Sequence, residues 1–277
     1  KRDLVRTWGQ RDTIHIYDSE TSWHQVVSAR KQWSAGGRRG PLPDLESRQA
    51  AYEIAMKKGL VFKKDFLSTI DPQYLAELHP RIGNEQARAV FACGRQAWLL
   101  SLDGNLCQSE KQGARQVYAT RKKWFPKLEW PDPLPDPQIA CLELTRRYLK
   151  INAPATANDV AHFFGAKVTT VRKWFAALEA ENELIGIECG GRKGLKALAA
   201  DEKELQIKPG GAKAWPVRLL PSWDTLLMSH RDKSWTMPDL SEHPLVWRKA
   251  AYVSSVVLSR GRVVGLWKMQ RKGQRLD

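Results

Sequence analysis

The sequence predicts an α+β fold in which helices and antiparallel strands follow one another along the chain. Two stretches each show helices followed by a glycine-centred pair of strands, and the last stretch is rich in strand-forming residues interrupted by basic turns. We therefore expect tandem winged-helix units plus a small C-terminal β-barrel-like domain. The expected segments are an N-terminal strand and loop region at 1–44, a first winged helix at 45–124, a Pro-rich linker at 125–137, a second winged helix at 138–200, and a β-rich C-terminal domain at 201–277.

The N-terminal region contains a strand with an unusually polar face. In the stretch "RTWGQRDTIHIYD", Arg11, Thr13 and His15 occupy alternate positions, with Ile14 and Ile16 at the positions between and after them. Because successive side chains of a strand point to opposite faces, the three polar residues should project together, away from the two isoleucines. We expect that polar face to be exposed or to line a cleft.

The first winged helix is predicted from three helices and a hairpin. "LESRQAAYEIAMKKG" should form a helix that ends at Gly59, "FKKDFLSTI" a short second helix, and "NEQARAVFACGRQAWLLSL" a longer third one. The third helix has one apolar stripe, formed by Val90, Phe91, Gly94, Ala97 and Trp98. A hairpin then follows, whose turn carries Lys111, Gly113 and Arg115.

The second winged helix has clearer local signals. Thr156 and Asp159 have the spacing of a capping box, and Gly165 should close the short helix that they begin. The helix expected at 169–181 buries a stripe at helical spacing, made of Val171, Trp174, Phe175 and Leu178. "LIGIECGGRKGLKAL" then reads as strand, glycine turn and strand, with Arg192, Lys193 and Lys196 around the turn.

The linker and the C-terminal domain differ from these units in composition. The stretch "WPDPLPDPQ" contains repeated prolines that exclude a helix and favour an extended connector. Beyond it, "VRLLPSWDTLLMSHRD" and "AAYVSSVVLSRGRVVGLWKMQRKGQRL" have the pattern of strands joined by basic turns. Residues 245–277 contain eight lysines or arginines and one acidic residue.

The composition points to a polyanionic partner. The chain of 277 residues has 45 Lys and Arg against 30 Asp and Glu, a formal net charge of +15. Its apolar runs are far too short to cross a bilayer, and no signal peptide is visible, so nucleic acid is favoured over a membrane. A basic surface alone does not separate DNA from RNA. Because the predicted winged helices are DNA-binding units, we expect double-stranded DNA as the partner, without a membrane and without an obligatory protein partner.

The cysteines argue against a metal site. Cys93, Cys107, Cys141 and Cys189 share no CxxC spacing and have no histidine at zinc-finger spacing. We interpret them as reduced, buried thiols of an intracellular protein and expect neither a metal nor another cofactor. The expected location is the cytoplasm.

The residues expected to bind DNA lie on the hairpins, on one helix and near the C-terminus. Glycine-flanked cations at a hairpin tip have no role in a core and reach phosphates instead. For the helix at 169–181 a solvated charged face is the alternative, because Glu179 and Glu181 accompany its cations. The full set is Lys111, Arg115, Arg172, Lys173, Arg192, Lys193, Lys196, Arg260, Arg262, Arg271 and Lys272.

Several of these segments together resemble the AlkZ-like winged-helix DNA glycosylases, and the resemblance covers most of the chain. They are "RTWGQRDTIH", the repeated winged helices, "LLPSWDTLLMSHRD" and "GRVVGLWKMQRKGQRL". Asp12 stands where that family usually has Gly, and Trp223 stands where it usually has Phe. The positions that match the family pattern are Arg11, Thr13, His15, Asp224 and Arg231.

The resemblance implies hydrolysis of the N-glycosidic bond of alkylated purines, including the unhooking of interstrand crosslinks. The family's catalytic signature is two glutamines that flank an aliphatic residue, and no such Gln-x-Gln occurs in this sequence. The chain opens on Lys rather than Met, so we expect a truncated start and a catalytic motif upstream of Lys1. The candidates for the active-site cleft are Arg11, Thr13, His15, Trp223, Asp224 and Arg231.

This chemistry needs neither a metal nor a covalent nucleophile. An alkylated purine is a cationic leaving group, so an amide that positions water can suffice for a monofunctional glycosylase. The alternative is a non-catalytic winged-helix DNA-binding protein or transcription regulator, because fold does not imply function. For the individual residues the alternatives are that His15 is a structural histidine bonded to a carbonyl, and that Asp224 is a turn or cap carboxylate.

Overall fold

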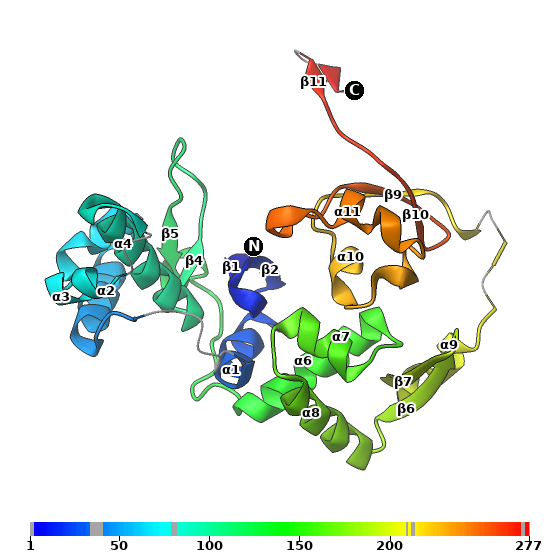
Figure 1. Ribbon diagram of the computed structural model, residues 1–277. Coiled ribbons are helices and arrows are strands. Elements are labelled where there is room, and N and C mark those ends of the chain that lie inside the picture. The colour runs from blue at the N-terminus through cyan, green and yellow to red at the C-terminus, as the bar shows by residue number, and fades with distance from the viewer. Residues whose placement is uncertain are drawn as a thin grey trace. The chain divides into compact units, whose positions relative to one another are not determined.

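The computed structural model describes residues 3–33, 41–78, 82–208, 210–211, 214–272 and 275–276, without the side chains of 250, 271–272 and 275–276. Contacts divide the chain into two units, 1–144 and 145–277 (Figure 1). Both contain helices and antiparallel sheets, so the predicted α+β class is confirmed at this level. Within the described ranges, no helix is long and apolar enough to cross a membrane.

Unit 1 begins with a β-hairpin and continues through a helical region to a second hairpin. Its elements are β1 (Leu4–Trp8), η1 (Gln10–Asp12), β2 (Ile14–Asp18), α1 (Trp23–Trp33), α2 (Leu45–Lys58), β3 (Leu60–Val61), η2 (Lys63–Thr69), α3 (Pro72–Glu77), α4 (Glu85–Leu102), β4 (Leu106–Gln108), β5 (Tyr118–Thr120), α5 (Arg121–Trp124) and the first part of α6 (Pro137–Asn152).

One five-stranded sheet combines the N-terminal hairpin with three strands from later in unit 1. Its order is β2-β1-β4-β5-β3, so the N-terminal hairpin extends the sheet that β4 and β5 form. All its pairs are antiparallel, with Arg6 opposite Gln108 where β1 meets β4. The loop between β4 and β5 projects beyond the strands (Figure 1).

Local signals explain the ends of the helices in this unit. The Asp44 carboxylate accepts the amide of Ser47 at the start of α2, and Gly59 at φ +70° ends the helix as predicted. The stripe predicted on α4 is wrong over its first turns, because Val90 and Phe91 are exposed there. Ala97 and Trp98 are buried, so only the C-terminal half of the stripe faces the core.

The expected linker packs against the core of unit 1. Phe125 is buried in a cluster with Val5, Trp23 and Val27, and Trp130 lies edge-on to Trp23 with ring centroids 5.0 Å apart. The segment between α5 and α6 forms neither helix nor strand, in keeping with its prolines. It therefore belongs to the packed part of unit 1.

Unit 2 consists of a helical region with a long hairpin, followed by short helices and a small sheet. After the end of α6 its elements are α7 (Ala157–Phe164), α8 (Val168–Ala180), β6 (Leu184–Cys189), β7 (Arg192–Leu198), η4 (Ala199–Asp201), α9 (Glu202–Leu205), β8 (Arg218–Leu220), α10 (Thr225–Ser229), η6 (Lys233–Trp235), η7 (Leu240–Glu242), α11 (His243–Val246), η8 (Lys249–Ala251), β9 (Val256–Ser259), β10 (Arg262–Leu266), β11 (Arg271–Lys272) and β12 (Arg275–Leu276).

The helical part of unit 2 follows the local sequence signals closely. Thr156 and Asp159 form the predicted capping box, and Gly165 ends α7 in the left-handed conformation. All four residues of the predicted stripe on α8 are buried, namely Val171, Trp174, Phe175 and Leu178. A bridge between Ala155 and Lys196 joins the turn before α7 to the β6–β7 hairpin.

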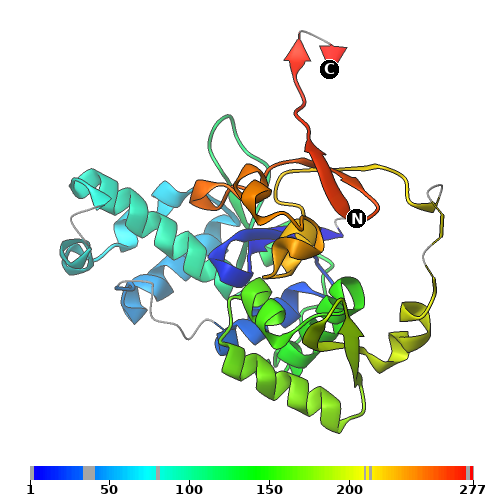
Figure 2. The ribbon, with the colours of Figure 1, turned by 45° about the vertical axis from the view of Figure 1, so that its right-hand side comes forward.

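The C-terminal part of unit 2 contains a three-stranded antiparallel sheet in the order β10-β9-β8. Leu227, Met237, Val246, Val253 and Val256 form the buried cluster beside it. The β11–β12 pair is separate from this sheet and stands beyond the end of β10 in both views (Figures 1 and 2).

Candidate functional site

The polar residues of the N-terminal region lie on a hairpin and not on one strand. β2 begins only at Ile14, and Arg11 lies in the short helix η1 that joins the two strands. The prediction that Arg11 shares a strand face with Thr13 and His15 is therefore wrong. Thr13 and His15 do come together, with Thr13 Oγ1 and His15 Nε2 2.7 Å apart.

The isoleucines of β2 face outward, which reverses the predicted orientation. Ile14 is 38% and Ile16 65% exposed, whereas Val5 and Thr7 on the other face of the hairpin are buried. His15 lies opposite Thr7, and Tyr17 lies opposite Val5, whose side chain packs in the Trp23 cluster. The alternation predicted which residues share a face, but the buried face is set by α1 beneath the hairpin.

His15 is bonded to its own loop. Its Nε2 lies 3.1 Å from the carbonyl oxygen of Gln10, and the Thr13 hydroxyl donates to the same carbonyl at 3.2 Å. We assign the imidazole proton to Nε2, since both oxygens accept from it. His15 thus makes the carbonyl contact expected of a structural histidine, while its Nδ1 retains a lone pair that can accept a hydrogen bond.

The surroundings keep this imidazole neutral. Burial lowers the pKa of His15 below its ordinary value of 6.5, the Arg11 charge acts in the same direction, and the hydrogen bond to Gln10 opposes them. Burial also raises the pKa of Tyr17, whose hydroxyl donates to the side-chain oxygen of Gln10. The site therefore presents neutral hydrogen-bonding groups near neutral pH.

The turn of this hairpin has unusual backbone geometry. Arg11 and Asp12 have φ of +57° and +56°, a conformation that glycine adopts freely and aspartate more readily than most residues. Asp12, at the position where glycine is usual, is thus compatible with the turn, and its carboxylate lies 3.8 Å from the buried Arg30 guanidinium. Gly9 is required by close approach, since a Cβ there would lie 1.7 Å from the Tyr17 hydroxyl.

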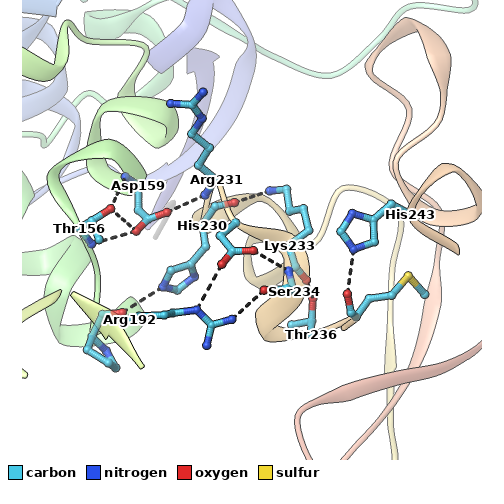
Figure 3. A network of polar contacts seen from close by, with 12 residues as sticks. Thr156, Asp159, Arg192, His230, Arg231, Lys233, Ser234, Thr236 and His243 are labelled. Atoms are coloured by element: carbon cyan, nitrogen blue, oxygen red, sulfur yellow. Dashed lines mark hydrogen bonds and ion pairs between the residues drawn. The ribbon is translucent and has the colours of Figure 1, made fainter. Parts of the chain in front are cut away.

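In unit 2 a buried carboxylate positions the segment that contains Arg231. Asp159 uses Oδ2 to accept the amide and hydroxyl of Thr156, and Oδ1 to accept the Arg231 amide at 2.8 Å (Figure 3). Figure 3 shows the Arg231 side chain directed away from this network. The backbone is fixed while the guanidinium is presented to solvent.

Four further hydrogen bonds hold the same segment. The Tyr148 hydroxyl donates to the Ser229 carbonyl at 2.9 Å, and His230 Nε2 lies 3.3 Å from the Pro154 carbonyl. Lys233 Nζ donates to the carbonyls of Leu227 and His230, at 3.0 and 2.5 Å. The stretch after α10 is therefore tied to the helices of unit 2 by backbone acceptors.

Trp223 and Asp224 are part of the turn that begins α10. Asp224 is the helix cap, since its Oδ1 accepts the amide of Leu226 at 2.9 Å, which confirms the cap role left open for it. Trp223 has φ +58° and is 51% exposed, and its indole donates to the Ala251 carbonyl at 3.0 Å. Its ring also contacts Tyr252 edge-on, with centroids 4.8 Å apart.

The three cations of the β6–β7 hairpin differ in their surroundings. Arg192 donates to Ser234 Oγ at 2.7 Å (Figure 3) and to Asp232 Oδ2 at 3.2 Å. Its guanidinium lies 4.0 Å from the Trp235 ring centroid. Lys196 Nζ lies 2.5 Å from Glu179 Oε1. The expectation that hairpin cations lack structural partners is wrong for Arg192 and Lys196, whereas Lys193 is exposed.

The remaining cations predicted to bind DNA are exposed where they are described. Lys111 and Arg115 lie in the β4–β5 loop, Arg172 and Lys173 on the outer face of α8, and Arg260 and Arg262 at the β9–β10 turn. Arg271 and Lys272 pair through their backbone with β12, and their side chains lie outside the described residues.

Sequence reasoning missed the residues that hold the site in place. Gln10 provides acceptors for Thr13, His15 and Tyr17, and Asp159 joins the cap of α7 to Arg231. The capping-box pattern identified Asp159 as a cap residue. Nothing in the sequence predicted that its second carboxylate oxygen accepts the Arg231 amide. Contacts between residues 72 positions apart depend on packing and not on local spacing.

The cysteines are mostly buried. Cys93, Cys107 and Cys141 are buried free thiols, whereas Cys189, next to the glycine turn of the β6–β7 hairpin, is exposed. The prediction of four buried cysteines is thus wrong at Cys189. Among the residues described, no group of three or more His, Cys, Asp or Glu side chains is placed to hold a metal ion.

The comparisons with known proteins agree with one another. The family model described as "DNA glycosylase AlkZ-like" matches residues 1–277. The chain is 25% identical to the interstrand DNA cross-link repair glycosylase of Streptomyces sahachiroi, over 96% of this chain and 70% of the relative. The solved structure of Streptomyces sahachiroi DNA glycosylase AlkZ has a similar fold, with a TM-score of 0.73 at 20% identity, over 99% of this chain and 72% of that one.

The substitution Gly9→Ala should destabilise unit 1 by roughly 1–3 kcal/mol, because the added methyl group displaces Tyr17 from Gln10. Chemical denaturation monitored by fluorescence measures the change. The double variant Gly9→Ala/Tyr17→Phe should recover part of the lost stability. It removes the hydroxyl that would lie 1.7 Å from the new Cβ, but the ring carbon Cζ, 2.7 Å from that Cβ, remains. A fully stable Gly9→Ala protein would contradict the close approach.

The stability of unit 1 should fall as the pH drops through the pKa of an unfolded histidine, about 6.5. A histidine with a lowered pKa in the folded state binds fewer protons there than when unfolded, so its contribution is complete above that pH and is lost below it. Unfolding of His15→Gln between pH 7.5 and 5 should depend less on pH than unfolding of the wild type. Parallel curves for the two proteins would refute the shift.

Arg192 and Lys193, neighbours on one hairpin, should respond differently to replacement. Arg192→Ala should cost roughly 0.5–1.5 kcal/mol, because it removes an ion pair and a cation–π contact. Lys193→Ala should change stability by less than about 0.5 kcal/mol. If Lys193 contacts phosphate, its removal should reduce the salt dependence of duplex binding by about 0.9 in log–log slope. Equal melting temperatures for both variants would rule out the anchoring role of Arg192.

Proposed function

The chain belongs to the AlkZ-like DNA glycosylase family, and from this premise we propose that it hydrolyses the N-glycosidic bond of alkylated purines in double-stranded DNA and unhooks interstrand crosslinks. The observation that carries the proposal is the match to the family over all 277 residues. The printed name of the curated relative, a cross-link repair glycosylase, supports the choice of substrate.

The chemistry of an alkylated purine explains how such hydrolysis proceeds without strong acid–base groups. Alkylation at N7 or N3 makes the base a cationic leaving group, so bond breakage needs water held in place more than it needs protonation of the base. We propose a monofunctional enzyme that forms no covalent intermediate and requires no metal. The product is then a free base and an abasic site in an intact strand.

We propose that the helical parts of both units are winged helices. In unit 1, α2, β3, η2, α4 and the β4–β5 hairpin follow one another in the required order, and β3 pairs with β5. In unit 2 the bridge from Ala155 to Lys196 takes the place of the first strand, between α6 and α7. The β-rich segment after them, with its three-stranded sheet, is proposed as the small barrel-like domain.

Contact with duplex DNA is proposed to run mainly through phosphates. Lys111, Arg115 and Lys193 are exposed on hairpin loops, and Arg172 and Lys173 are exposed on α8. Such contacts neutralise the DNA backbone without reading bases, so affinity should fall steeply with salt and depend weakly on sequence. The family supports DNA as the substrate.

The candidate cleft residues have different proposed roles. The exposed guanidiniums of Arg11 and Arg231 are proposed to bind phosphate or the damaged nucleotide. His15 has its Nδ1 available to hold a water, while Thr13 orients the ring through the 2.7 Å contact. Asp224 supports the turn in which the exposed Trp223 ring is offered for stacking.

We place this activity in the bacterial cytoplasm, at the nucleoid, where the proposed substrate occurs, and we propose no obligatory protein partner. The curated relative comes from a bacterium, which is consistent with that location.

An excision assay with the full-length protein tests the function. A duplex with one N7-alkylated guanine and one with a defined interstrand crosslink are incubated with excess enzyme, with and without EDTA. We expect release of the base, abasic sites that break only after heating in alkali, unhooking of the crosslink, and no effect of EDTA. His15→Ala should lower the excision rate by about 10 to 1,000-fold, as for other preorganised donors, with much less effect on duplex affinity.

The control is the same duplex without the lesion, which should remain intact. Tight duplex binding without excision would instead support a non-catalytic DNA-binding protein. Excision that EDTA abolishes would reject metal independence, and direct strand cleavage would reject a monofunctional mechanism.

A further inference from the structure

Five exposed lysines of unit 1 lie outside the residues discussed so far. The stretches 57–64 ("KKGLVFKK") and 121–127 ("RKKWFPK") contain eight lysines or arginines and no acidic residue. Within the described part of the chain, six of these cations are exposed and form no ion pair. Lys127 lies beyond the end of α5, and the other five are Lys57, Lys63, Lys64, Lys122 and Lys123. We call these five residues the β3 basic edge.

Pairing of β3 with β5 brings the two stretches together. Leu60 lies opposite Ala119, and the Thr120 amide donates to the Gly59 carbonyl at 2.8 Å. A Cβ on Gly59 would lie 3.4 Å from Lys123 Cγ, so the Lys123 side chain lies over the end of α2. The C-terminal end of α2, the start of η2 and the short helix α5 therefore carry their lysines around one strand.

Two other cations in these stretches, Lys58 and Arg121, are already engaged. Lys58 Nζ is 2.8 Å from Asp65 Oδ1, which joins the end of α2 to η2. Arg121 donates to the Gly104 carbonyl at 2.9 Å and stacks over Trp130 at 4.0 Å. The edge thus combines cations that have structural partners with exposed cations that form no ion pair to the residues described.

Structural explanations account for only part of this charge. β3 is the last strand of its sheet, and lysines beside such an edge discourage pairing with another chain. Lys57 also lies in the last turn of α2, where a cation favours the helix dipole. Lys122 and Lys123 lie in the four-residue helix α5, which follows β5, so they belong neither to the edge strand itself nor to the last turn of α2.

We propose that the β3 basic edge is a second phosphate-binding surface of unit 1, distinct from the β4–β5 loop, which binds the backbone of duplex DNA. Lysines here act as flexible point charges and need no fixed geometry. The inference rests on the proposed function only in taking DNA as the polyanion. It adds a site whose contribution is to affinity and not to base excision.

The test compares two charge-matched double variants. Lys64→Gln/Lys123→Gln removes two charges from the edge, and Lys203→Gln/Lys208→Gln removes two exposed charges near Glu202 and Glu204 in unit 2. Affinity for an undamaged 20-base-pair duplex is measured from 50 to 200 mM salt. The edge variant should lose about 1.8 in log–log slope and on the order of 50-fold in affinity at 0.1 M salt, while the control changes little.

Undamaged duplex keeps this test separate from the test of catalysis. A protein that binds through the edge but excises no base would overturn the proposed function and leave this inference standing. Equal losses for both variants would overturn the inference, since net charge alone then explains binding. Binding of the edge variant to anionic phospholipid vesicles is measured in parallel. If this variant loses vesicle binding but keeps its affinity for DNA, the inference is overturned too. Melting temperatures check folding, and if the first variant is unstable, Lys63→Gln/Lys122→Gln repeats the measurement.

Discussion

The buried carboxylate of Asp159 is the contact on which the arrangement of unit 2 depends. One of its oxygens completes the capping box of α7, and the other holds the amide of Arg231, far away in the sequence. A side chain that binds both a helix start and a distant loop ties the position of the loop to that of the helix. Because Asp159 binds the backbone amide of Arg231, the backbone at this residue is held in place while the guanidinium remains free to bind a ligand.

The same division between a fixed backbone and an available side chain occurs in unit 1. Gln10 gathers Thr13, His15 and Tyr17 around one turn, and Gly9 allows the close approach of the tyrosine. The neutral imidazole is held by one nitrogen and presents the other. In both units the polar groups that carry the proposed chemistry depend on partners that resemblance to a family does not identify.

Sequence reasoning was most successful where structure is determined locally. The capping box of Thr156 and Asp159, the end of α2 at Gly59 and the buried stripe of α8 depend on residues within two helical turns, and all are confirmed. It failed where a second element decides the outcome. The buried face of β2 depends on α1, and the engagement of Arg192 depends on Asp232 and Trp235, which are about 40 residues away. The exposed start of α4 shows the same limit, because an apolar stripe does not specify what covers it.

The exposed thiol of Cys189 makes one hairpin of this protein chemically addressable. The other three cysteines are buried, and Cys189 pairs with Arg192 across the glycine turn, beside the residues that anchor the hairpin. A maleimide probe should therefore attach at this one position without any engineered cysteine. Because Arg192 restrains the hairpin, a fluorophore attached there would report on what approaches the turn more than on motion of the turn itself.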